Sequence, residues 1–304
     1  MPSRFVVDWR IVAPCLVLCA GVCWGLIGLF SQVLAAQGLS SVQITVVRCT
    51  IVTVLLFCWL ILRSPRAFRI RLRDIWMFVG TGIVSIAFFN VCYFACIQEA
   101  NLSLAAILLY TAPCFVVLLS ALLFKEHMTR KKITALLIAF VGCLLVVGLG
   151  SQTAHISLFG ILVGLGSGIG YALYSIFARF ALARYSPVVV MFYTFLLASV
   201  ALVPISSAQD IVMVGLSSYP VLLVMLGLAV ISTLLPFVCY TVGLQHMETG
   251  KASIMAFVEP MVALLIGVGV FHDVLTVLNG VGIILILLAV TLLNMPQKFG
   301  PTER

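Results

Sequence analysis

Residues 93–129, YFACIQEANLSLAAILLYTAPCFVVLLSALLFKEHMT, align without a gap with residues 240–276, YTVGLQHMETGKASIMAFVEPMVALLIGVGVFHDVLT, at an offset of 147. The residues shared between the two stretches include the pairs Tyr93/Tyr240, Gln98/Gln245, Ala105/Ala252, Ile107/Ile254, Pro113/Pro260, Phe124/Phe271 and Thr129/Thr276. Upstream, Gly21 and Phe30 meet Gly168 and Phe177 at the same offset. The constant offset indicates a duplicated unit, with residues 1–150 as the first repeat and 151–304 as the second.

The composition indicates an integral membrane protein. Hydrophobic residues make up 63% of the chain, charged residues only 9%, and the mean hydropathy is +1.28. A soluble globule cannot keep so much apolar surface away from water. Apolar runs long enough to cross the hydrocarbon as helices lie near 11–36, 42–62, 75–97, 103–124, 133–149, 157–178, 188–205, 219–242, 253–271 and 275–293.

These runs predict an all-α polytopic membrane protein with about ten transmembrane helices, five in each repeat. Because five is an odd number, the second repeat must enter the bilayer upside down relative to the first. Inverted repeats of this kind are typical of secondary transporters, whose binding sites lie near the middle of the membrane between the repeats.

The basic residues fix a predicted orientation. All of them except Arg48 fall at the chain ends or in loops on one side of the predicted bundle: Arg4, Arg10, Arg63, Arg66, Arg69, Arg71, Arg73, Lys125, Arg130, Lys131, Lys132, Arg179, Arg184, Lys251, Lys298 and Arg304. Lys and Arg prefer cytoplasmic loops, so both termini are expected in the cytoplasm. The net charge of +8 is thereby explained without a nucleic-acid partner, and residues 63–73 are also placed to touch anionic lipid headgroups.

The order of these features resembles the drug/metabolite transporter superfamily, specifically its ten-helix branch built from two EamA-type repeats. The motifs that carry the resemblance are Trp24-Gly25, the lone Arg48, the Tyr110–Pro113 stretch, Glu259-Pro260, and the segments Phe124-Lys125-Glu126 and Phe271-His272-Asp273, where the family usually has Gly-Glu. The resemblance covers essentially the whole chain. It implies a bacterial inner-membrane permease that moves small metabolites, often amino acids or their relatives, outward by alternating access.

Two charged residues within predicted spans are candidates for solute contact. A charge at mid-span costs about 2.5–3.5 kcal/mol on insertion scales, so Arg48 is expected to face a cavity, a partner or the membrane surface. Glu259 directly precedes Pro260, and its counterpart in the first repeat is the neutral Ala112. An acid in one repeat alone suits a proton site or a contact for a solute amine. Alternatively, Glu259 reaches water or backbone at a helix end, or Arg48 and Glu259 neutralise each other.

Prolines and aromatic residues extend this candidate site. Pro113 and Pro260 occupy equivalent places in the fourth and ninth helices, where each removes a backbone donor and predicts a kink, either for packing or for lining a pathway. Polar and aromatic residues expected along a cavity wall are Trp24, Asn90, Tyr93, Tyr110, Tyr171, Tyr174 and Tyr240. Tyrosines suit amphipathic solutes, although interfacial belts also favour them.

Catalytic and metal-binding patterns are missing from the sequence. None of His127, His155, His246 and His272 has a zinc-binding spacing, and no P-loop, H-E-x-x-H or G-x-S-x-G element occurs. Cys15, Cys19 and Cys23 share one helix face, which we interpret as helix packing, as we do the stripe of Gly160, Gly164 and Gly168. We therefore expect no enzyme activity, no cofactor and no metal, with transport driven by an ion or solute gradient.

The function predicted from the sequence is secondary active transport of a small-molecule solute across a lipid bilayer, by a monomer or a homodimer. Proton coupling through Glu259 is the expected mechanism. Two alternatives remain at this level. The first is a multidrug exporter of lipophilic cations, and the second is a non-transporting accessory or lipid-handling protein in which the buried charges serve assembly.

Overall fold

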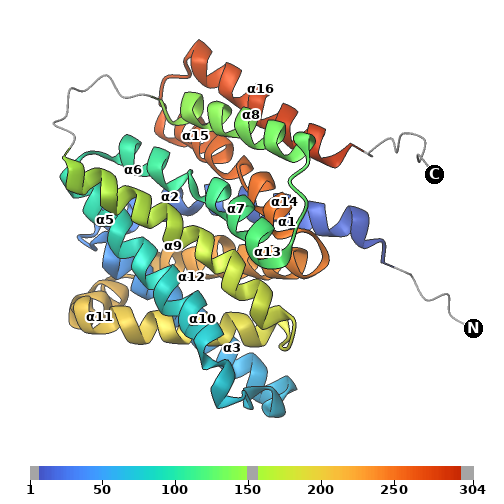
Figure 1. Cartoon of the computed structure of the whole chain (residues 1–304). Helices are drawn as coiled ribbons and strands as arrows, with labels where there is room; N and C mark the ends of the chain where they lie inside the picture. The colour runs from blue at the N-terminus through green and yellow to red at the C-terminus, as the bar shows by residue number, and fades with distance from the viewer. Residues whose placement is uncertain (1–6, 149–156, 296–304) are drawn as a thin grey trace, which may run out of the picture.

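The computed structural model describes residues 7–148 and 157–295, and within these ranges the chain is a bundle of helices (Figure 1). Arg4, His155, Lys298 and Arg304 lie outside the described residues. Nine stretches of the described chain are long and apolar enough to cross a membrane. The tenth predicted span, 133–149, corresponds to a helix at Arg130–Val147, whose 18 residues include three basic ones at its start. The predicted all-α, two-repeat membrane architecture is confirmed, with a span count close to ten.

The first repeat contains five long helical segments, and three of these segments are each divided into two helices. Its elements are α1 (Trp9–Gly25) and α2 (Ile27–Ala36), α3 (Ser41–Arg63), α4 (Ile75–Val79) with α5 (Phe88–Glu99), α6 (Leu102–Leu109) with α7 (Ala112–Phe124), and α8 (Arg130–Val147). Gly80–Ala87, between α4 and α5, is wound as a π-helix. Leu26 separates α1 from α2, and Tyr110-Thr111 separate α6 from α7, two residues before Pro113.

The second repeat follows the same plan. Its elements are α9 (Leu158–Leu182), α10 (Pro187–Leu202), α11 (Ala208–Ser217), α12 (Tyr219–Ala229) with α13 (Leu235–His246), α14 (Thr249–Met255) with α15 (Val258–Phe271), and α16 (Val277–Asn294). Val230–Leu234, between α12 and α13, is again a π-helix, at the positions equivalent to 83–87. Ala256-Phe257 break the ninth span shortly before Pro260. The short helix α11 was not predicted, because its ten residues fall between the predicted spans 188–205 and 219–242.

Equivalent threonines start the last helix of each repeat. The Thr129 side chain accepts a hydrogen bond from the Lys132 N–H, and Thr276 does the same for the Asn279 N–H. Side-chain caps of this kind satisfy backbone donors that a helix start leaves without partners. The two capped helices, α8 and α16, lie side by side (Figure 1). Their backbones touch at glycines: a Cβ on Gly282 would lie 2.6 Å from the Gly142 carbonyl oxygen.

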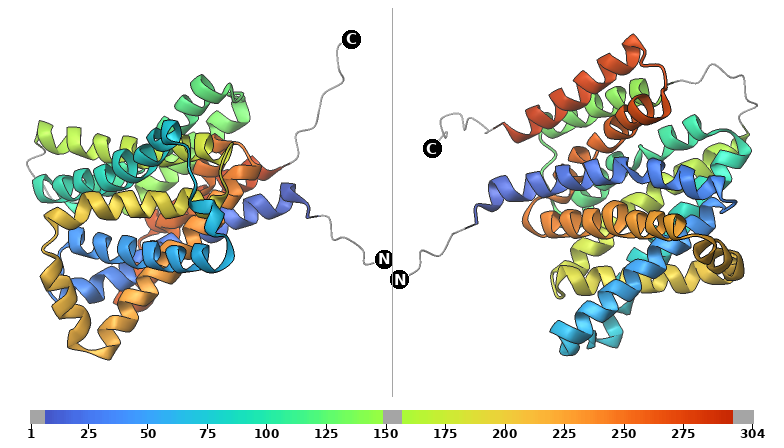
Figure 2. Two further views of the ribbon diagram at one scale, coloured as in Figure 1. Left: turned by 90° about the horizontal axis from the view of Figure 1, so that it is seen from below. Right: turned by 180° about the vertical axis from the view of Figure 1, so that it is seen from behind.

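The repeats are interleaved rather than stacked as separate halves. Helix α1 packs along α13 and α15 of the second repeat (Figure 2), and its counterpart α9 packs along α5 and α7 of the first. The predicted glycine stripe on α9 faces α5 and α6: a Cβ on Gly164 would lie 2.9 Å from the Cys96 sulfur of α5, and a Cβ on Gly168 would lie 2.7 Å from the Leu108 carbonyl oxygen of α6. Of the cysteines of α1 for which packing was predicted, Cys23 is buried, whereas Cys15 and Cys19 are exposed.

One end of the bundle carries the loops with most of the basic residues, and we call it the basic end. It comprises residues 63–74, 125–130, 179–186 and 246–251, together with the first turn of α1 and the last turn of α16. Contacts join these segments: Trp9 stacks on His246 at a centroid distance of 3.5 Å, and the Lys131 ammonium donates to the Met295 carbonyl. The starts of α3 and α6 lie at the opposite end.

Two helices end on residues in the left-handed region, which leads to a stability prediction. Lys125 ends α7 with φ 56°, and the equivalent His272 ends α15 with φ 60°. Both positions are exposed. A side chain in this conformation costs about 1–2 kcal/mol, and glycine avoids that cost. We expect Lys125→Gly and His272→Gly each to raise the free energy of unfolding by about 0.5–1 kcal/mol, measured by thermal unfolding in detergent.

Lys125→Ala is the matched control for this experiment, because alanine removes the same charge but keeps the Cβ. An equal gain in the alanine variant would assign the effect to charge and contradict the backbone explanation.

Candidate functional site

A cavity of about 490 Å³ lies between the two repeats. Its walls come from α1, α2, α3, α5, α6, α7, α9, α13, α14 and α15, together with the π-helix Gly80–Ala87 and the turns between the split helices. All nine polar, charged and aromatic candidates from the sequence line it: Trp24, Arg48, Asn90, Tyr93, Tyr110, Tyr171, Tyr174, Tyr240 and Glu259. Pro113 also lines the cavity, whereas Pro260 is buried in the packing behind Glu259. Neither α8 nor α16 contributes to the wall.

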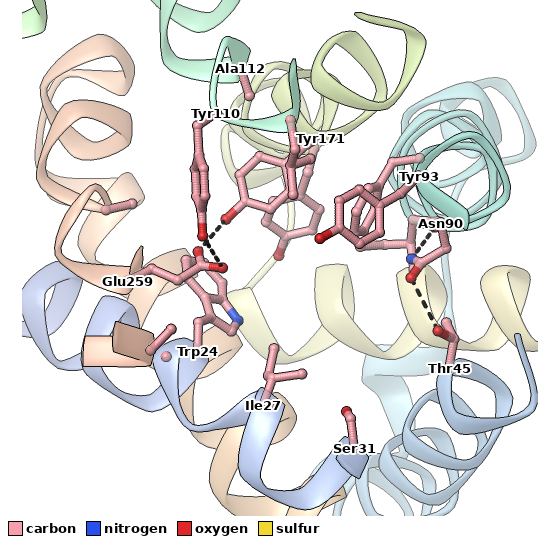
Figure 3. Close-up of a pocket in the computed structure, with 18 of the residues that line it drawn as sticks. Trp24, Ile27, Ser31, Thr45, Asn90, Tyr93, Tyr110, Ala112, Tyr171 and Glu259 are labelled. Carbon is pink, nitrogen blue, oxygen red and sulfur yellow. Dashed lines mark hydrogen bonds between the residues drawn. The ribbon is translucent and has the colours of Figure 1, made fainter. Parts of the chain in front are cut away.

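Glu259 is presented to the cavity by the break in the ninth span. Because α15 begins at Val258, the Glu259 side chain stands in its first turn, where the helix dipole favours a carboxylate. The Tyr171 hydroxyl donates to Oε2 at 3.2 Å and the Tyr110 hydroxyl to Oε1 at 3.5 Å (Figure 3). Among the described residues, no Lys, Arg or His nitrogen lies within 4.0 Å of this carboxyl group.

Arg48 belongs to a second polar group, on another part of the wall. Its Nη2 donates to the Asn90 Oδ1 at 3.4 Å, and the Thr45 hydroxyl donates to the same oxygen at 3.1 Å. Asn90 is held in turn by its Nδ2, which donates to the Ile86 carbonyl at 2.7 Å. Within the described chain Arg48 forms no salt bridge, so in this conformation Arg48 and Glu259 are not in direct contact as an ion pair.

Aromatic rings line the space around these polar groups. Trp24 lies against the second-repeat rings Tyr171, Phe237 and Tyr240, at centroid distances of 6.4, 5.4 and 5.2 Å. Tyr93 lines the wall between the Glu259 and Asn90 groups (Figure 3). The arrangement offers one acidic contact, one basic contact and an aromatic wall to a single solute.

The sequence analysis missed several residues of this wall. Thr45 and Phe237 line the cavity, as does Ser85 of the first π-helix. A signal for Phe237 was present, because it is the residue equivalent to Asn90 at the offset of 147. Thr45 gave no such signal, because an isolated threonine in an apolar run usually bonds to its own helix, as Thr45 also does to the Ser41 carbonyl.

The cavity extends away from the basic end. Its wall includes Ala35, Ser41, Ile97 and Leu102, which lie at or near the helix ends opposite the basic end. Toward the basic end, hydrogen bonds close the space between α9 and α13. They join Tyr174 to Thr241 at 2.7 Å, Ser175 to Tyr240 at 2.8 Å, and Arg179 to the Leu244 carbonyl at 2.6 Å.

Glu126 completes this closure by bridging the repeats. Its carboxylate accepts from the Thr249 and Gly250 N–H groups at the start of α14, at 2.6 and 3.0 Å, and pairs with Lys132 at 3.2 Å. The equivalent acid of the second repeat, Asp273, is exposed, and in the described chain its side chain forms no hydrogen bond. Among the described residues, the Glu126 bridge at the basic end therefore has no counterpart at Asp273, although other hydrogen bonds join the repeats at the Asp273 end, such as the one from Asn279 Nδ2 to the Leu145 carbonyl at 3.0 Å.

The Glu126 contacts predict a pH dependence of stability. Although burial acts in the opposite direction, the backbone N–H donors and Lys132 hold the pKa of the Glu126 carboxyl below its ordinary value. Because the native pKa is below the unfolded one, the contribution to stability is complete above about pH 4.3 and is lost as the pH falls through the native pKa. Glu126→Gln should remove about 1–3 kcal/mol at pH 7 and flatten this acid limb, as measured by thermal unfolding from pH 7 downward. An unchanged acid limb in Glu126→Gln would contradict the bridge.

An all-helical bundle of inverted repeats with a cavity at their interface defines a polytopic membrane transporter, and the comparisons identify which kind. The EamA-like transporter family model matches residues 11–148 and again residues 158–295. The chain belongs to the EamA-like transporter family, within the drug/metabolite transporter superfamily.

Individual relatives agree with this assignment. An Archaeoglobus fulgidus transporter is 33% identical over 213 residues, covering 68% of this chain and 74% of that protein. The threonine/homoserine exporter RhtA of Salmonella typhimurium is 27% identical over 197 residues, covering 64% of this chain and 62% of RhtA. A solved crystal structure superposes with a TM-score of 0.76 over 92% of this chain and 95% of the other, at 18% identity, which shows a shared fold.

Proposed function

We propose that the chain is a proton-coupled secondary exporter of amino acids or related small amphipathic metabolites in the bacterial inner membrane. The observation that carries the proposal is Glu259, a carboxyl group in the cavity between the repeats, held by two tyrosine hydroxyls and with no Lys, Arg or His nitrogen within 4.0 Å in the described ranges. A carboxyl group in that position is suited to exchange a proton for the amine of a solute, because no cation is in direct contact with it there.

Arg48 is the proposed contact for the solute carboxylate. In the part of the chain that the structure describes, its guanidinium donates to Asn90 alone, so its remaining donors are available to an anion. Trp24, Tyr93, Tyr110, Tyr171, Tyr174 and Tyr240 form the proposed wall around the solute. A zwitterion satisfies both charges of the cavity at once, which neither a simple anion nor a simple cation does.

The orientation follows from charge. With the basic end in the cytoplasm, both termini are cytoplasmic and the cavity opens to the outside. In the opposite state, rocking of repeat 1–150 against repeat 151–304 exposes the same residues to the cytoplasm, with the kinks near Pro113 and Pro260 lining the path. Export is supported by the similarity to RhtA. One chain builds the whole cavity, so a monomer would suffice and a homodimer would hold two pathways.

The test is flux of a mixed amino-acid and metabolite panel in proteoliposomes, with and without an imposed pH gradient. The expected result is saturable, gradient-dependent flux of zwitterionic solutes. Arg48→Gln should weaken transport of solutes that carry a carboxylate about tenfold or more, the usual loss for a charged hydrogen bond. Arg66→Gln, in a loop at the basic end, is the control and should transport normally. No flux under any gradient, from folded protein, would refute the proposal.

The aromatic wall supports one other candidate, export of lipophilic cations. Trp24 and the rings around it are suited to cation–π contacts beside the Glu259 carboxylate. Such a solute needs Glu259 but not Arg48. The two proposals therefore separate in Arg48→Gln, which would keep cation transport and lose amino-acid transport, and in competition of the wild-type flux by lipophilic cations.

A further inference from the structure

A second hollow lies at the basic end, outside the transport cavity. It has a volume of about 340 Å³ and is lined by Arg69, Arg71, Arg73, Asp74, Arg184 and Tyr185. The first four belong to the connection between α3 and α4 in the first repeat, and the last two belong to the connection between α9 and α10 in the second. The hollow is thus assembled from both repeats.

The floor of the hollow is formed by Asp74, which its neighbours hold in place. Asp74 is 1% exposed, accepts a hydrogen bond from the Tyr185 hydroxyl at 2.7 Å and pairs with the Arg184 guanidinium. The Tyr185 oxygen also accepts from the Arg71 N–H at 3.1 Å, and Tyr193 donates to the Phe68 carbonyl at 2.8 Å. These bonds hold the arginine-bearing backbone in place, so the rim of the hollow does not depend on the arginine side chains themselves.

The rim has an excess of positive charge. Asp74, already occupied by Arg184, is the sole carboxylate of the hollow, while Arg69, Arg71 and Arg73 have no carboxylate within 4.0 Å in the described chain. The backbone is extended at Arg69 and at Arg71. Residues two apart in extended backbone point the same way, which accounts for Arg69 and Arg71, while Arg73 reaches the hollow from the 3₁₀ turn Leu72–Asp74. Three guanidinium groups are thus gathered with mutual repulsion that a bound anion would relieve.

The positive-inside bias explains why these residues are at this end of the bundle, but it does not require them to surround one hollow. The equivalent positions of the second repeat are Leu216, Ser218 and Pro220, which lie at the other end of the bundle and carry no charge. The cluster is therefore a feature of the first repeat and was not copied from the duplicated unit.

We propose that this hollow is a binding site for a phosphate group, with Arg69, Arg71 and Arg73 as its ligands and Asp74, Arg184 and Tyr185 as positioning residues. A phosphate offers acceptor oxygens to several guanidinium forks at once, whereas a carboxylate is satisfied by one. Two sources share this chemistry: the headgroup of an anionic phospholipid in the facing leaflet, and inorganic phosphate from solution.

The experiment measures thermal unfolding of the full chain in two arms. In detergent, inorganic phosphate is titrated against chloride at constant ionic strength. In nanodiscs, phosphatidylcholine alone is compared with phosphatidylcholine containing phosphatidylglycerol. A saturable rise of the melting temperature in the first arm identifies free phosphate as the ligand, and a rise confined to the second identifies the lipid headgroup. Arg69→Gln should weaken either response about tenfold or more.

The matched control is Arg66→Gln, which removes the same charge from the same loop outside the hollow and should respond like the wild-type protein. Arg69→Lys distinguishes the contribution of the planar guanidinium group from that of its charge, because lysine keeps the positive charge but lacks the pair of coplanar N–H donors. If Arg69→Gln and Arg66→Gln weakened the response of the melting temperature equally, the response would depend on the overall positive charge of the loop, and the proposed binding site would be refuted. The absence of any response of the wild-type protein in both arms would also overturn it.

Discussion

Glu259→Gln is expected to abolish transport driven by a pH gradient while leaving a folded protein. Glutamine has the same shape, and its carbonyl oxygen still accepts from Tyr171 or Tyr110, so the wall of the cavity is preserved. It cannot take up or release a proton, and it offers no charge to an amine. We expect gradient-driven flux to fall about 100-fold, which corresponds to about 3 kcal/mol, the size of one buried charged interaction.

The matched control is Glu99→Gln, because Glu99 is an exposed acid at the open end, and its carboxylate accepts a hydrogen bond from the Ser157 hydroxyl at 3.4 Å. That variant should transport at the wild-type rate. Exchange of labelled for unlabelled solute without a gradient then separates two roles. Exchange retained in Glu259→Gln assigns the carboxyl group to coupling alone, and exchange lost assigns it to solute contact. Wild-type flux under a gradient in Glu259→Gln would remove Glu259 from the mechanism.

Gly282→Leu is expected to have the largest effect on stability. A Cβ at residue 282 would lie 2.6 Å from the Gly142 carbonyl oxygen and 2.9 Å from Val146 Cγ2, so leucine forces α16 away from α8. Neither helix lines the cavity, so solute affinity of any folded fraction should be unchanged. We expect the free energy of unfolding to fall by about 3 kcal/mol or more, the upper range for overpacking against backbone.

Gly280 provides the control on the same helix, since a Cβ there meets nothing within 4 Å. Gly280→Leu should unfold at or slightly above the wild-type temperature, because the helix gains propensity without a clash. The readouts are the melting temperature and the monodisperse yield in detergent. If Gly282→Leu and Gly280→Leu had the same melting temperature, the close contact between α8 and α16 would make no contribution to the stability of the fold.

The fold was predictable because two independent patterns in the sequence agree. The hydropathy of each run gives a span, and the offset of 147 gives the duplication, so the arrangement of ten segments in two inverted repeats follows without any contact being known. The interruptions are less visible. Ala256-Phe257 is as apolar as its neighbours, and the hydroxyl groups of Tyr110-Thr111 do not by themselves indicate a break, so the following prolines are the main signal. The two π-helices have no sequence signal that we recognise.

The composition of the cavity was predictable for a different reason. Polar and aromatic residues are costly in lipid, so those within spans tend to turn inward, and all nine candidates do. What the sequence does not contain is which of them touch. The separation of Arg48 from Glu259 depends on Asn90 and Thr45, which reach Arg48 through the packing of α3 against α5. The role of each residue in transport stays a prediction.

The partners of α1 have a consequence for how the protein is made. Apart from its continuation α2, the described elements that pack closely on α1 belong to residues 230–271 of the second repeat. When this helix leaves the ribosome and enters the bilayer, its partners have not yet been synthesised. Until the eighth and ninth spans are inserted, Trp24 and the small residues beside it must face lipid or an insertion chaperone. Assembly of this transporter is thus delayed until translation is nearly complete, and a truncated first half would lack the surface that its own first helix needs.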